Sequence, residues 1–87
     1  MNEAFKALQA RFIDRCRSDL ELLTSGGDAS ELRMLVHRLA GAAGVFGFAD
    51  ISDLAGRLEG QAQDGAAFDP TDMAALQAAL RNLVDAH

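Results

Sequence analysis

His37 is the residue of this chain best placed to do chemistry. With successive residues about 100° apart around a helix axis, segment 32–46 has an apolar face, and His37 lies on the opposite face. The apolar face carries Leu32, Leu35, Leu39, Ala42, Ala43 and Phe46. An exposed imidazole is mostly neutral at pH 7, and its unprotonated nitrogen can attack an activated phosphoryl group. The pattern therefore indicates a surface nucleophile.

Two glycines, Gly41 and Gly44, are the surface neighbours of His37 on this helix. Each glycine inside a helix costs about 1 kcal/mol relative to alanine, so the helix is weakened where the imidazole emerges. Two interpretations are open. The bare backbone lets a second protein approach the ring closely, or it lets a neighbouring helix of the same chain pack tightly.

The run from His37 to Gly47 resembles the signature of histidine-containing phosphotransfer (HPt) domains. That signature has a histidine, a hydrophobic residue two positions later, a lysine at three, a glycine at four, then small residues and a further glycine. The chain matches it with His37, Leu39, Gly41, Ala42, Ala43 and Gly47. Segment 51–59 is similar to the next helix of the family.

This resemblance implies that His37 accepts a phosphoryl group from a phosphoaspartate and passes it to another receiver domain. The implied partners are a response-regulator receiver domain, a hybrid histidine kinase, or both. Mg²⁺ is expected on the receiver domain, so the chain needs no cofactor or metal of its own and is a phosphocarrier rather than an enzyme. The expected docking surface around the histidine comprises Met34, Ala40, Gly41, Gly44 and Val45.

One position departs from the family pattern, because Ala40 stands where the family has lysine. That lysine can offer a cation to the phosphoryl oxygens. Arg33 lies one turn before His37 on nearly the same face and is the first substitute, while Arg38 points about 100° away and is the second. Either could hold a phosphate through charge-assisted hydrogen bonds, or be an ordinary solvated arginine.

The same departure supports an alternative function, a helical interaction domain that docks a receiver or kinase without transferring phosphate. A third interpretation is the dimerisation helix pair of a sensor kinase. That class has an acidic residue directly after the histidine and a proline shortly beyond, whereas this chain has Arg38 and no proline in the segment. The predicted neighbours of His37 are basic, apolar or glycine, which argues against a metal site at this histidine.

Composition excludes several other classes of function. The net charge is −5 and Lys6 is the one lysine, which disfavours nucleic-acid binding. No apolar run approaches the ~20 residues of a membrane span. Cys16 is the one cysteine, which excludes an internal disulfide, fits a reducing cytoplasm and, with two distant histidines, gives no zinc-ligand spacing.

The elements that position His37 are predicted to be four helices at about 2–24, 28–46, 50–64 and 69–86. Short connections and one apolar stripe per helix favour an all-α, antiparallel, up-down-up-down four-helix bundle. It forms a single domain over residues 1–87, and a monomer is the simplest expectation. The predicted helix starts are Asp28, Asp50 and Asp69 followed by Pro70, and the predicted stops include Gly26 and Gly47.

The first predicted helix has an apolar stripe with one unexpected member, Asp19. The stripe consists of Phe5, Leu8, Phe12, Cys16, Leu20 and Leu23. A carboxylate at this place should pair with Arg15 or another arginine. Gly56 and Gly60, on the outer side of the third helix, are candidate points of close approach.

Overall fold

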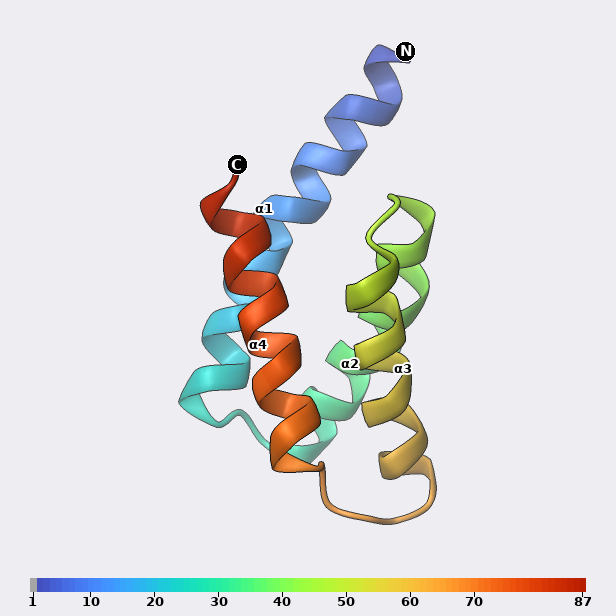
Figure 1. The fold of residues 1–87 in the computed structure, drawn as a ribbon, viewed down its shortest axis with the longest axis vertical. Coiled ribbons are helices and arrows are strands. Elements are labelled where there is room, and N and C mark those ends of the chain that lie inside the picture. The colour runs from blue at the N-terminus through green and yellow to red at the C-terminus, as the bar shows by residue number, and fades with distance from the viewer. Residues whose placement is uncertain (1) are drawn as a thin grey trace.

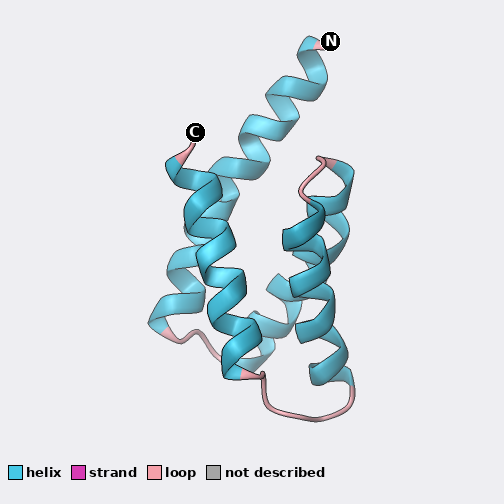
Figure 2. Cartoon of the chain, in the orientation of Figure 1, coloured by secondary structure: helices cyan, strands magenta, loops and turns pink. Residues whose placement is uncertain are grey.

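The structure, a computed structural model, describes residues 2–87 as four helices joined by short loops (Figures 1 and 2). The helices are α1 (Glu3–Ser25), α2 (Ala29–Val45), α3 (Ala49–Gln63) and α4 (Pro70–Asp85). Successive helices run antiparallel, alternately down and up in Figure 1, with α2 against α3, α3 against α4, α4 against α1 and α1 against α2. The predicted four-helix bundle is confirmed. No helix of residues 2–87 is both long enough and apolar enough to cross a membrane.

Two of the three predicted acidic N-caps are confirmed. The Asp28 carboxylate accepts a hydrogen bond from the Glu31 backbone N–H at 2.9 Å, and Asp69 accepts from Thr71 and Asp72 at 2.8 and 3.1 Å. The predicted stops at Gly26 and Gly47 are also confirmed, because Gly26 directly follows α1 with a φ of 81° and Gly47 follows the C-cap of α2 with a φ of 87°.

The predicted start of α3 is confirmed to within one residue, but the predicted N-cap at Asp50 is wrong. The helix begins at Ala49, with Phe48 as N-cap and no side-chain hydrogen bond, so Asp50 lies within the first turn. The Phe48 ring stacks on Phe12 of α1 with 5.9 Å between centroids, and Phe12 also contacts Phe46 at 5.2 Å. Aromatic packing of the α2–α3 turn against α1, rather than a cap, therefore sets where α3 starts.

The core lies between the four helices and differs from the predicted stripes at their margins. Ile13 and Val36 are buried although they lie beside the predicted stripes, because each helix of a square bundle has two neighbours and buries a broad face. Leu8 is 52% exposed, so its predicted core position is wrong. The first turns of α1 project beyond the end of the bundle (Figure 1), and Leu8 is not among the side chains packed against the core.

The suggested close approach at Gly56 and Gly60 is also wrong. A Cβ added at either position would meet nothing within 4 Å outside its own helix. The packing of α3 therefore gives no steric reason for these two glycines.

Asp19 and Arg38 form an ion pair that joins α1 to α2. The Arg38 Nη2 donates to Asp19 Oδ1 at 2.6 Å, and the Asp19 side chain is only 6% exposed. The second carboxylate oxygen, Oδ2, is buried without a hydrogen-bond partner. This confirms the expectation that Asp19 pairs with an arginine. A carboxylate held in the core by a single arginine makes that arginine important for stability.

We predict that Arg38→Ala lowers the free energy of unfolding by about 3 kcal/mol, because it leaves the Asp19 charge buried and unpaired. The double variant Asp19→Leu/Arg38→Leu should recover most of this loss, because no charge is then left in the core. Urea unfolding followed by circular dichroism measures both. Arg81→Ala, at an exposed arginine, is the control and should change stability by less than about 0.5 kcal/mol. Equal effects of Arg38→Ala and Arg81→Ala would contradict the assignment.

Candidate functional site

His37 lies near the middle of α2 and points away from the core. Its side chain is 76% exposed, whereas Val36 and Leu39, on the inner face of the same helix, are fully buried. The predicted outward orientation of the histidine is confirmed. The fold thus presents an imidazole to solvent from a helix whose opposite face is anchored in the core.

A carboxylate of α3 contacts the imidazole. Glu59 Oε2 pairs with His37 Nδ1, and the Glu59 side chain is 23% exposed. The expectation that the neighbours of His37 are only basic, apolar or glycine is therefore wrong. The missed signal was the pairing of antiparallel helices, because His37 and Glu59 lie at nearly equal distances along the chain from the α2–α3 turn.

This contact determines which imidazole nitrogen can react. An ionised carboxylate accepts hydrogen bonds but donates none, so Nδ1 must carry the proton in the contact with Glu59. In the neutral ring, Nε2 then holds the lone pair. A carboxylate that orients a histidine in this way also favours the positive charge that the ring acquires when Nε2 forms a new bond.

The two glycines beside His37 have different surroundings. A Cβ on Gly44 would lie 3.4 Å from Ser52 Oγ of α3, at the short end of van der Waals contact. Ser52 Oγ also donates to the Ala40 carbonyl at 2.6 Å, so α3 closely approaches α2 here. A Cβ on Gly41 would meet nothing within 4 Å. Helix packing therefore requires glycine at neither position, because a Cβ on Gly44 would make only ordinary van der Waals contact and a Cβ on Gly41 would meet no neighbour.

The other predicted docking residues lie along the outer side of α2. Met34 and Val45 are 72% and 70% exposed, and Ala40 is half-buried. Met34 lies one turn before His37 and Val45 lies two turns after it. The exposed face of α2 is therefore apolar on both sides of the imidazole.

A surface hollow that helical periodicity does not predict lies beside His37, between α1 and α2. These two helices have the least contact of the four adjacent helix pairs. The walls of the hollow come from Arg15, Asp19 and Leu22 of α1 and from Glu31, Met34, Leu35, His37 and Arg38 of α2. The Asp19–Arg38 pair closes the inner part of the hollow, and the histidine is part of its rim.

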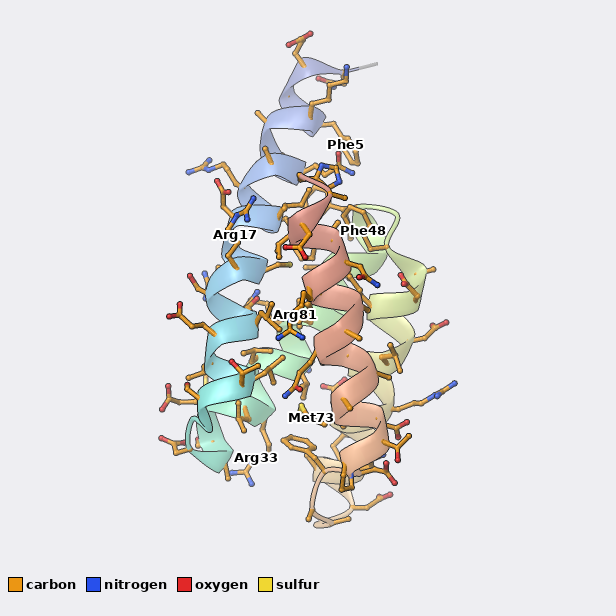
Figure 3. All side chains as sticks on the ribbon, turned by 60° about the vertical axis from the view of Figure 1, so that its left-hand side comes forward. Phe5, Arg17, Arg33, Phe48, Met73 and Arg81 are labelled. Carbon is orange, nitrogen blue, oxygen red and sulfur yellow. The ribbon has the colours of Figure 1, made fainter. Side chains whose placement is uncertain are left out.

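The two arginines predicted as phosphate partners lie differently from each other. The Arg38 guanidinium is held by Asp19, so its tip is turned toward α1. Arg33 lies at the end of the bundle where α1 passes into α2 (Figure 3). Hydrogen bonds from Glu31 hold the pKa of the Asp28 carboxyl below its usual value, and the Arg33 charge contributes to the same lowering. Arg33 therefore faces the start of α2, and it does not line the hollow.

Cys16 is buried in the core and is not part of the site. Burial, with the nearby Asp19 charge, raises the pKa of its thiol to about 11, so the nucleophilic thiolate is scarce at neutral pH. Within residues 2–87, no group of three or more histidine, cysteine, aspartate or glutamate side chains is arranged to hold a metal ion.

The family model for the Hpt domain matches residues 5–86, nearly the whole chain. Comparisons with curated proteins and with solved structures gave no match.

We predict that Gly41→Ala raises the free energy of unfolding by about 0.5–1 kcal/mol, because alanine favours the helix and its Cβ enters open space. Thermal unfolding followed by circular dichroism measures the change. Gly26→Ala is the contrasting variant and should destabilise the protein, because Gly26 has a positive φ. A loss of stability in Gly41→Ala would show that the space at Gly41 is not open.

Proposed function

The chain belongs to the Hpt domain family, and on this premise we propose that His37 is the phosphoacceptor of a phosphorelay. His37 takes a phosphoryl group from the phosphoaspartate of one receiver domain and passes it to the aspartate of another. The observation that carries the proposal is the exposed imidazole whose Nδ1 is held by Glu59. This arrangement leaves Nε2 as the nucleophile on an open surface.

The transfer step follows from that geometry. The Nε2 lone pair attacks phosphorus, the bond between phosphorus and the aspartate oxygen breaks, and the aspartate leaves as a carboxylate. The proton on Nδ1 stays in place, so the ring becomes positively charged, and Glu59 stabilises that charge. The reverse sequence of bonds returns the phosphoryl group to an aspartate. The Nδ1 proton need not leave in either direction.

The chain acts as a carrier in this proposal. The receiver domain contributes the aspartate, the Mg²⁺ and most of the stabilisation of the transferring phosphoryl group, and the chain contributes the nucleophile and a docking surface. The exposed apolar side chains of Met34 and Val45 support docking along α2. Gly41 supports close approach of a partner, because a side chain there would hold the partner's rim away from His37.

The proposed cellular setting is a monomer in the cytoplasm. Four helices close one core, and each helix packs on two neighbours of the same chain. A free, buried Cys16 fits a reducing compartment.

The alternative function is a domain that docks a receiver or kinase without accepting phosphate. Its support is Ala40, which leaves the helix of His37 without the lysine of the family pattern. Of the two substitutes predicted on that helix, Arg38 is engaged by Asp19 and Arg33 remains.

We predict that a radiolabelled phosphorylated receiver domain transfers acid-labile, base-stable label to the wild-type chain and none to His37→Gln. The melting temperature of His37→Gln should be nearly unchanged, because the side chain is exposed and surface substitutions cost less than about 0.5 kcal/mol. The chain contains one other histidine, and the matched control His87→Gln should be labelled like the wild type.

Label retained on His37→Gln would contradict the assignment of the phosphoacceptor. A folded wild-type chain that accepts no label from several different receivers, yet binds one of them, would instead establish the docking-only function.

A further inference from the structure

The proposed function places negative charge beside His37, at a surface that lacks the lysine of the family pattern. A phosphoryl group brings up to about two negative charges to the ring nitrogen. At the position of the family lysine the chain has only the methyl group of Ala40. A cation for the phosphoryl oxygens must therefore come from elsewhere on the surface around His37.

The hollow between α1 and α2 indicates which residues could supply this cation. Its lining includes two arginines besides His37, namely Arg38 of α2 and Arg15 of α1. Arg38 cannot turn to the phosphoryl group without leaving the Asp19 carboxylate buried and unpaired, because no other group of residues 2–87 hydrogen-bonds that carboxylate. Because Arg38 is held in the ion pair with Asp19, it is not available to bind the phosphoryl group.

Arg15 is free to move. It is exposed, and within residues 2–87 no carboxylate lies within ion-pair distance of its guanidinium. Asp19, one turn further along α1, is the acidic residue it would otherwise meet, and Arg38 already occupies that carboxylate. The other carboxylate lining the hollow belongs to Glu31, which forms no ion pair with Arg15.

We propose that Arg15 supplies the cation for the phosphoryl group on His37, reaching it along the hollow between α1 and α2. This inference rests on the proposed function and assigns a phosphate-binding role to a residue of α1. A guanidinium is suited to it, because its planar set of N–H donors can bind two phosphoryl oxygens at once. The cation then comes from α1 and the histidine from α2. The Asp19–Arg38 pair holds these two helices together and so also sets the distance between Arg15 and His37.

The test is the equilibrium between the phosphorylated chain and a phosphorylated receiver domain, measured from the label on each protein. A group that binds the phosphoryl oxygens favours the phosphorylated chain. Arg15→Gln should therefore shift the equilibrium toward the receiver by about fivefold, and Arg15→Lys should shift it less because the charge is kept. Arg17→Gln is the matched control, since Arg17 lies on the same helix and faces Asp14 instead.

Arg33→Gln distinguishes the two candidate cations. The proposal predicts a smaller shift than that of Arg15→Gln, because Arg33 faces the start of α2. A wild-type equilibrium in Arg15→Gln, or a larger shift in Arg33→Gln than in Arg15→Gln, would overturn the role of Arg15 and leave the proposed function of His37 intact. A wild-type chain that takes no label at all would overturn the proposed function together with this inference. Circular dichroism should give the same melting temperature for all four variants.

Discussion

The contact between Glu59 and His37 makes the chemistry of an exposed ring depend on the packing of two helices. Glu59 follows directly after Leu58, which is fully buried on the inner face of α3, so the carboxylate is positioned by the core. His37 follows Val36, which is fully buried on the inner face of α2. Any change in the register of α2 against α3 would separate the carboxylate from the ring. The choice of reactive nitrogen is thus a consequence of how the bundle packs.

On its other side, the histidine borders a surface that the core leaves open. Of the four adjacent helix pairs, α1 and α2 have the least contact, and the Asp19–Arg38 ion pair links them. A buried ion pair contributes less to stability than an apolar contact of the same size, but it permits few alternative arrangements of the two helices. The proposed site therefore combines a fixed contact toward α3 with an open hollow toward α1. This suits a residue that must be held in orientation and still be reached by a partner.

The sequence predicted the features that depend on local order along one helix. The outward face of His37, the caps at Asp28 and Asp69 and the stop at Gly26 follow from helical periodicity and terminal hydrogen bonds. These properties need no knowledge of the neighbouring helices. The family motif then added an expectation for the role of His37 that periodicity alone does not contain.

The features that sequence reasoning missed depend on contacts between helices. Glu59 reaches His37 because α2 and α3 pair in one particular register, and Arg38 turns inward because Asp19 lies opposite on α1. Leu8 continues the apolar stripe of α1 but is 52% exposed, so the stripe overestimates the core. Each case needed the lengths and relative positions of two helices, which one helical wheel does not provide.

The most direct test of the account is the tautomer of His37, measured by long-range ¹H–¹⁵N correlation on protein labelled with ¹⁵N-histidine. At a pH where the ring is neutral, we expect Nδ1 to carry the proton and Nε2 the lone pair. His87, in the same spectrum, is the internal reference for an unconstrained ring. In Glu59→Ala, the His37 signals should move to the tautomer mixture of His87. A wild-type His37 that carries its proton on Nε2 would contradict the central claim that Glu59 leaves Nε2 free to accept a phosphoryl group.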